Sequence, residues 1–226
     1  MALNFSTTDK ASAQHGIKAL VYGKSGAGKT YLASTAPSPI VLSAESGVLS
    51  LRGFTIPMIH ITRVEDLTEA YEWLTRSKDA QQFQTIYIDS ISEIGEVVLA
   101  NARRQVKDPR QAYGELIDKM LTTLKAYRDL PNKHVVMSAK QEPTKDELTG
   151  IVTYGPSMPG NKLGPQLPYL FDEVFRLGIN KTPQGEQFRF IQTAPDLQYD
   201  AKDRSGALDP IEPPDLTHIF NKILGV

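Results

Sequence analysis

The sequence contains no cysteine, which excludes several kinds of site at once. Without thiols the chain has no disulfide framework, no thiolate nucleophile, no zinc ribbon and no cysteine-bound iron–sulfur cluster. It also lacks an excess of charge of either sign, because 25 Lys and Arg residues accompany 26 Asp and Glu residues, for a net charge of −1. Since this balance gives no overall attraction to nucleic acid, DNA binding would require a local basic patch.

Long apolar runs are missing as well. No run approaches the roughly 20 residues that a membrane-spanning helix needs. Residues 1–10 show no basic segment followed by an apolar one, as an export signal would. We therefore expect no membrane association and a cytoplasmic location. The 226 residues, of which 40% are apolar and 23% charged, are typical of a globular protein with a sizeable core.

Strand and helix patterns alternate from residue 17 to residue 139. Strands are predicted at 17–22, 40–42, 85–88 and 134–139, and helices at 29–36, 92–106 and 112–129. This alternation predicts crossover connections and a mostly parallel sheet between helical layers, which is an α/β fold. We expect a single domain over residues 17–226, because no linker separates two cores, after a flexible N-terminal arm at 1–16.

The character of the sequence changes after residue 139. Residues 140–162 are rich in Gly, Pro, Thr and Lys and are predicted to form a long loop. The apolar segments 173–179 and 187–193 flank a turn that contains Pro183 and Gly185, which predicts an antiparallel hairpin at the sheet edge.

Residues 23–30 read Gly-Lys-Ser-Gly-Ala-Gly-Lys-Thr and match the pattern G-x-x-x-x-G-K-[ST]. Glycines let successive backbone amides face phosphate oxygens, and the N-terminus of the following helix attracts anions. We therefore expect a P-loop that binds ATP, with Lys29 on the β and γ phosphates and Thr30 on Mg²⁺. The predicted nucleotide-binding residues are Gly23, Lys24, Ser25, Gly26, Ala27, Gly28, Lys29, Thr30 and Tyr31.

Acidic residues follow two of the predicted strands. Asp89 ends the strand 85–88 and, because ligands gather at the carboxyl ends of parallel strands, should be the second Mg²⁺ ligand beside Thr30. Ser90 or Ser92 should cap the next helix. Glu45 follows the strand 40–42, which we expect to neighbour the P-loop, and it is the candidate to orient an attacking water. The alternative for Glu45 is a solvated loop glutamate.

A basic cluster joins the two predicted helices after Asp89. Its cations are Arg103, Arg104, Lys107 and Arg110. They are followed by Tyr113, and a basic groove with an aromatic ring is typical of single-strand binding without sequence preference. The alternative is a solvated helix end, where cations complement the helix dipole.

The order of these motifs resembles that of the RecA-like core ATPases. The resemblance rests on residues 23–30, then on Ala44-Glu45, then on Tyr87-Ile88-Asp89-Ser90. It implies that Glu45 is the catalytic base and that Lys140 or Gln141 occupies the polar sensor position. It also places residues 141–162 in the second DNA-binding loop, where Lys145 and Lys162 would contact DNA.

The segment Ala201-Lys202-Asp203-Arg204 resembles the paired basic residues with which RecA filaments touch ATP in a neighbouring subunit. This would make Lys202 and Arg204 catalytic residues that act on the ATP of a neighbouring subunit, whereas the catalytic residues Lys29 and Glu45 act on the ATP of their own subunit. The alternative is an ordinary surface ion-pair cluster.

More closely, the chain resembles the phage-encoded AAA-type ATPases that are RecA-like single-strand annealing proteins. The segments Asp172–Arg176 and Lys202–Gly206 carry this likeness. It implies a three-layer P-loop NTPase with a RecA-like core, ATP hydrolysis with Mg²⁺, single-stranded DNA binding and annealing or recombination. It further implies a homo-oligomeric ring or helical filament with ATP at the subunit interfaces, a single-strand binding protein as a partner, and the host bacterial cytoplasm as location.

Two other functions are compatible with a P-loop. A small nucleotide or metabolite kinase would also carry an arginine-rich lid over the phosphates, and no such lid is recognisable. An assembly adaptor that uses ATP as a structural switch would not need a water-activating residue such as Glu45.

Overall fold

The computed structural model describes residues 7–8, 15–45 and 47–226. Most of the predicted arm at 1–16 therefore lies outside the described residues. The strands are β1 (Lys18–Gly23), β2 (Pro39–Ser43), β3 (Met58–His60), β4 (Thr85–Asp89), β5 (His134–Lys145), β6 (Val152–Ser157), β7 (Glu173–Lys181), β8 (Gln187–Gln192), β9 (Lys202–Asp203) and β10 (Ile211–Glu212). The α-helices are α2 (Lys29–Leu32), α3 (Val64–Arg76), α4 (Ile91–Gln105), α5 (Pro109–Arg128), α6 (Leu167–Leu170) and α7 (Leu216–Leu224).

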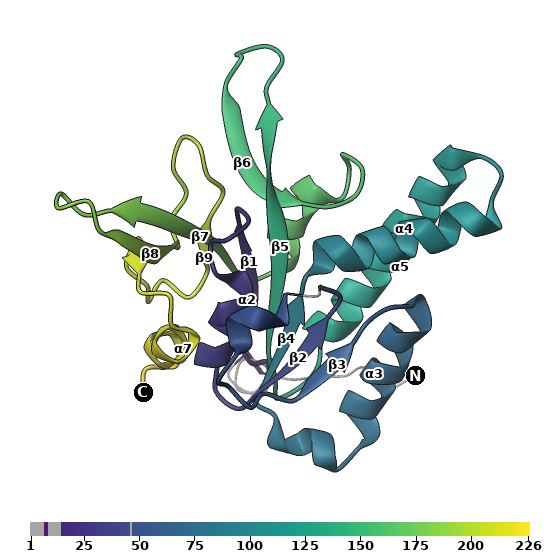
Figure 1. Cartoon of the computed structure of the whole chain (residues 1–226), viewed down its shortest axis with the longest axis horizontal. Coiled ribbons are helices and arrows are strands. Elements are labelled where there is room, and N and C mark those ends of the chain that lie inside the picture. Colours follow the sequence, from purple (N-terminus) through teal and green to yellow (C-terminus); the bar gives the residue numbers. More distant parts are fainter. Residues whose placement is uncertain (1–6, 9–14, 46) are drawn as a thin grey trace.

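These strands form one sheet, and the order along its main path is β10-β8-β7-β1-β5-β4-β2-β3. The strands from β7 to β3 in this order pair in parallel, whereas β7 and β8 form an antiparallel hairpin whose outer side pairs with β10 (Figure 1). The predicted edge hairpin is thus confirmed. One expectation was wrong: the strand before Glu45, β2, does not neighbour the P-loop strand β1, because β5 and β4 lie between them.

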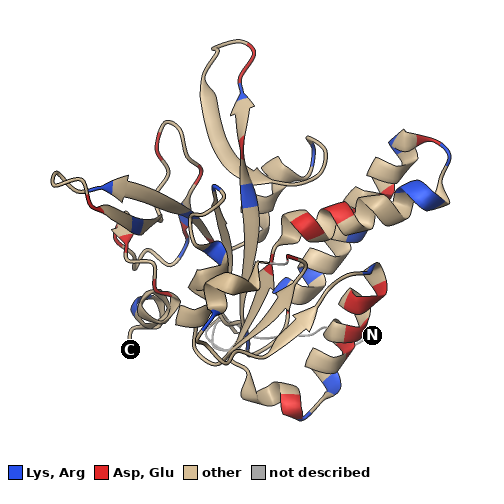
Figure 2. Cartoon of the chain, in the orientation of Figure 1, with Lys and Arg blue, Asp and Glu red and all other residues tan. Residues whose placement is uncertain are grey.

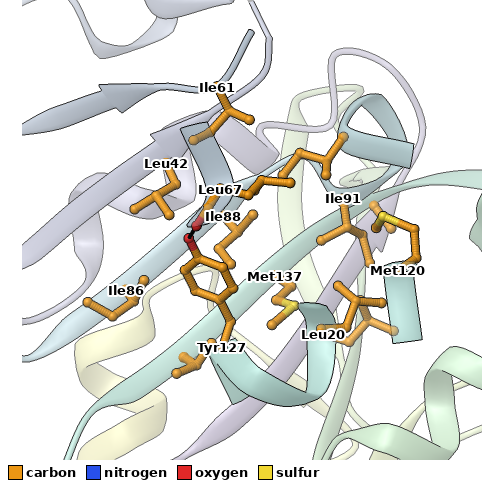
Figure 3. Packing of buried hydrophobic residues seen from close by; sticks show 14 of the residues in the cluster. Leu20, Leu42, Ile61, Leu67, Ile86, Ile88, Ile91, Met120, Tyr127 and Met137 are labelled. Carbon is orange, nitrogen blue, oxygen red and sulfur yellow. Dashed lines mark hydrogen bonds between the residues drawn. The ribbon is translucent and has the colours of Figure 1, made fainter. Parts of the chain in front are cut away.

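Helices cover both faces of the sheet (Figure 1). Alternate side chains of β1 enter different cores: Leu20 and Tyr22 pack with α3, α4 and α5, whereas Ala19 and Val21 pack with α2 and α7. Figure 3 shows the first core, in which the Tyr127 hydroxyl donates to the carbonyl of Leu67 at 2.6 Å. The predicted fold class, a three-layer α/β P-loop fold with a mostly parallel sheet, is confirmed.

The predicted long loop at 140–162 is wrong for most of its length. Instead, β5 continues to Lys145 and pairs in antiparallel register with β6, so that the two form a hairpin that projects from the sheet (Figure 1). The Asp146 carboxylate accepts from the amides of Leu148 and Thr149, and Gly150 has a φ of 71°. This turn brings the two strands into register. Residues of low strand propensity can then pair, because each strand satisfies the backbone groups of the other.

The helices α4 and α5 form a second projection, an antiparallel helical pair (Figure 1). Asp108 caps α5 by accepting from the amide of Arg110 at 2.9 Å, and Pro109 occupies the first turn. Among the described residues, none of the helices combines the length and the apolar character that a membrane-spanning helix needs.

Candidate functional site

The loop between β1 and α2 has the backbone of a phosphate cradle. Gly26 and Gly28 adopt φ angles of 77° and 105°, a region that residues with a Cβ rarely occupy. The Lys29 amine donates to the carbonyls of Gly23 at 2.9 Å and Lys24 at 3.2 Å, so its side chain folds back over the loop. Burial lowers the pKa of Lys29, while the carboxylates of Glu45 and Asp89 act in the opposite direction.

The two predicted Mg²⁺ ligands lie side by side. The hydroxyl of Thr30, in α2, donates to Asp89 Oδ2, at the end of β4, at 2.7 Å, although β5 lies between β4 and the P-loop strand β1. The Ser138 hydroxyl of β5 donates to the other Asp89 oxygen. Burial raises the pKa of Asp89, while these two hydrogen bonds lower it.

This pair of oxygen ligands fits Mg²⁺. The ion prefers hard oxygen ligands and usually keeps several waters and substrate phosphates around one or two protein groups. Such a site needs fewer side chains than a closed metal cage, and no group of three or more His, Cys, Asp or Glu residues suited to a metal occurs among the described residues. Thr30 and Asp89 would hold Mg²⁺, which neutralises charge on the β and γ phosphates when bound.

Glu45 faces the same cleft from the end of β2. Its Oε1 accepts a hydrogen bond from the Ser90 hydroxyl at 2.6 Å, and its backbone carbonyl accepts from Ser43 at 2.8 Å. Ser90 also accepts from the amide of Glu93 at 3.4 Å and is the N-cap of α4. The second predicted cap, Ser92, instead donates to the carbonyl of Ser157. Glu45 is therefore held in place rather than free in a solvated loop.

Lys140 lies beside the P-loop, because β5 pairs it with Gly23. Of the two predicted sensor residues, Lys140 is the one in register with β1, and Gln141 lies one residue beyond the end of that pairing. The Lys140 amine forms an ion pair with Glu93 of α4. Glu93 is thus paired with Lys140, whereas Glu45 lies on the wall of the cleft.

A cleft of about 640 Å³ lies along the P-loop and Glu45, and Asp89 and Lys140 do not belong to its wall. Its wall is formed by Ser25, Gly26, Gly28, Lys29, Thr30, Tyr31, Leu32, Glu45, Ser50, Arg189 and Pro214. Gly23, Lys24 and Ala27 belong to the loop beside the cleft rather than to its wall. Arg189 of β8 is a residue that sequence reasoning missed, since it lies far along the chain in an edge hairpin and carries no motif.

The predicted DNA-binding cations do not belong to the wall of this cleft, and four of them lie at the tip of the α4–α5 projection. Arg103 and Arg104 lie in the last turn of α4, Lys107 in the connecting turn and Arg110 in the first turn of α5, and all four are exposed. Figure 2 shows Lys and Arg at the far end of this projection. The Arg103 guanidinium donates to the Tyr113 hydroxyl at 3.1 Å, so this ring is already in contact with the cluster.

The other two predicted DNA contacts are separated from that cluster. Lys145 is the last residue of β5, at the tip of the β5–β6 hairpin, and Lys162 is exposed in the segment that follows β6. The structure thus distributes the predicted DNA-binding cations over three places.

Lys202 and Arg204 lie toward the opposite end of the strands from the P-loop. β9 pairs with the start of β7, which is in register with Ala19 and Leu20 rather than with Gly23. The Lys202 amine donates to the carbonyls of Pro168, at 2.6 Å, and Phe171. Arg204 forms an ion pair with Asp172 at 2.7 Å. Asp172 is far from Arg204 in the sequence, and the two meet because β9 runs along β7, which begins directly after Asp172.

Comparison with known proteins places the chain in a family. Residues 15–205 match the family described as the AAA domain. No curated protein matches the chain. Two similar solved structures are a KaiC-like protein from the hyperthermophilic archaeon Pyrococcus horikoshii OT3, with 13% identity and a TM-score of 0.44 over 79% of each chain, and the RadB recombinase, with 16% identity and a TM-score of 0.43 over 79% of this chain and 80% of that one.

The family match spans most of the chain and includes every residue of the cleft except Pro214. The matched residues include the P-loop, the Thr30–Asp89 pair and Glu45. These groups lie close together, as in a site that binds a nucleotide. The chain therefore belongs to the AAA domain family of P-loop ATPases, a family whose members bind a nucleotide, usually with Mg²⁺.

Proposed function

We propose that this ATPase hydrolyses ATP with Mg²⁺, binds single-stranded DNA and promotes annealing or recombination in a phage. The observation that carries the proposal is the placement of Glu45 on the wall of the cleft that holds Lys29 and Thr30. The hydrogen bond from Ser90 orients this carboxylate and leaves its second oxygen to accept a proton from water. A pure ATP switch would have no use for such a group.

The DNA-binding part of the proposal rests on the exposed cations at the turn between α4 and α5. A projecting basic tip can follow a phosphate backbone without hindrance from the rest of the domain. The direct test measures ATP turnover with and without single-stranded DNA. Stimulation by DNA supports the proposal, whereas phosphate transfer to a small acceptor would identify a kinase.

Reversing the charge of Arg103, Arg104 and Lys107 to Glu is expected to weaken single-stranded DNA binding and to flatten its salt dependence. The slope of log K against log salt should fall in magnitude by about 2, since each lost single-strand phosphate contact removes about 0.7. Binding is measured by fluorescence anisotropy at several salt concentrations. The matched control reverses three exposed cations elsewhere, Arg52, Lys78 and Lys181. Equal slopes in both variants would show that the cluster does not contact DNA and is only a solvated helix end.

We further propose that ATP lies at a subunit interface of a ring or filament and that Arg204 reaches it from the neighbour. A residue that acts on another subunit's ATP must lie away from its own P-loop. Arg204 does so, because it directly follows β9, which pairs with the start of β7. With 63% of its side chain exposed, Arg204 is accessible, whereas Lys202 is held by two backbone carbonyls. A head-to-tail contact of this kind closes into a ring or continues as a helix.

Subunits with Arg204→Ala and subunits with Lys29→Ala are each expected to lack most ATPase activity. Mixing them in equal amounts should restore about a quarter of the wild-type rate, the share of interfaces that combine an intact P-loop with an intact arginine when subunits assort at random. Turnover is followed as phosphate release, and size-exclusion chromatography checks assembly. If the mixture stays inactive while both variants assemble, Arg204 does not act in trans.

A further inference from the structure

Arg189 lies against the P-loop although it is 162 positions along the chain from Ala27, the loop residue that it contacts. Its Nε donates to the Ala27 carbonyl at 3.0 Å. A Cβ added to Gly28 would lie 3.2 Å from the same Nε and 3.3 Å from Cδ of Arg189. The hairpin of β7 and β8 thus brings a guanidinium to the middle of the phosphate cradle.

Arg189 reaches the cleft from a different part of the sheet than Asp89 and Glu45 do. Among the residues that the structure describes, Lys29 and Arg189 are the two cations on the wall of the cleft. The sheet order places β8, which carries Arg189, on one side of β1, and β4 and β2, which lead to Asp89 and Glu45, on the other side. Arg189 therefore faces the cleft from the side opposite the predicted metal ligand and base.

The contact with Ala27 occupies only one edge of the guanidinium. Among the described residues, the Nη atoms of Arg189 have no hydrogen-bond partner, and the residue is exposed. A planar, permanently charged fork with free donors suits phosphate oxygens, to which arginine binds in a bidentate manner. In a P-loop the backbone at this position surrounds the α and β phosphates, while the lysine serves the β and γ phosphates.

We propose that Arg189 binds the phosphate chain of the nucleotide in the same subunit, at the phosphates that ATP and ADP share. The inference rests on the proposed nucleotide-binding function and adds to it a positioning residue from outside the P-loop motif. Because this residue belongs to β8, the edge hairpin would contact the bound nucleotide before and after hydrolysis.

The test compares dissociation constants for Mg·ATP, Mg·ADP and pyrophosphate by isothermal titration calorimetry. Arg189→Ala is expected to raise all three by about tenfold, because it removes a charge-assisted contact. Arg189→Lys should retain part of the affinity, and Arg189→Gln should behave like the alanine variant. The matched control is Lys181→Ala, which removes an exposed cation from the same hairpin outside the cleft. Thermal unfolding without ligand checks that each variant folds.

Each other outcome contradicts the proposal in a recognisable way. Wild-type affinity in Arg189→Gln would show that the charge of Arg189 does not contribute to binding and that a neutral hydrogen bond to Ala27 is sufficient. Weaker ADP binding with unchanged pyrophosphate binding would place Arg189 at the base or ribose. A loss confined to ATP would place it at the γ phosphate. If wild-type protein binds none of the three ligands, the proposed function falls as well, whereas normal binding by every variant overturns only the role of Arg189.

Discussion

Replacing Lys29 with alanine is expected to lower kcat/KM for ATP by at least about 100-fold, the usual cost of removing one group that stabilises developing charge. The Lys29 amine already lies over the loop, within hydrogen-bond distance of the Gly23 and Lys24 carbonyls. From there it can turn toward the β and γ phosphates without moving the backbone. Its loss removes the cation expected at the β and γ phosphates, and the other described cation of the wall, Arg189, is held against Ala27.

The measurement combines equilibrium binding of ATP with steady-state turnover. Lys29→Ala should affect both, since the lysine contacts the phosphates in the ground state and in the transition state. Burial disfavours the charged amine, so the fold itself should tolerate alanine and the thermal midpoint should not fall. The control Lys125→Ala removes an exposed cation of α5 outside the cleft. Wild-type affinity and turnover in Lys29→Ala would refute the assignment of residues 23–30 as a P-loop.

The sequence predicted that Thr30, Asp89 and Glu45 would lie near one another, because this placement follows from local pattern and strand polarity. The P-loop is contiguous, Asp89 ends β4 and Glu45 follows β2, and the carboxyl ends of these parallel strands lie at one edge of the sheet. Strand order was not needed for this. Thr30 lies in α2, beyond the end of β1, and its hydroxyl meets Asp89 at 2.7 Å even though β5 lies between β1 and β4.

Arg189 and the β5–β6 hairpin could not be predicted in this way. The contact of Arg189 with Ala27 depends on the register of β7 and β8 and on their place beside β1, and none of these leaves a local pattern. The β5–β6 hairpin has a loop-like composition, and Pro143 even lies within its paired segment, opposite Tyr154. Pairing that satisfies the backbone outweighed local propensity there.

Replacing Glu45 with glutamine is expected to lower kcat by about 100-fold or more while ATP binding stays within about threefold of wild type. The Ser90 hydroxyl donates to Glu45 Oε1, and an amide oxygen accepts that bond equally well. Glutamine therefore preserves the shape of the cleft and its contact with α4. It removes only the ability to take a proton from water during attack on the γ phosphate, a loss that appears in kcat rather than in affinity.

A second substitution distinguishes loss of the base from a general loss of charge. Glu69→Gln changes an exposed glutamate of α3 in the same way, away from the cleft, and should leave both constants unchanged. If Glu45→Gln keeps wild-type turnover, another group activates the water. Glu93 does not fill that role as placed, because its carboxylate is paired with Lys140. If Glu45→Gln instead weakens ATP binding as strongly as it lowers kcat, the carboxylate acts on the bound substrate and not on the water, because a base used only during attack leaves the ground-state complex unchanged.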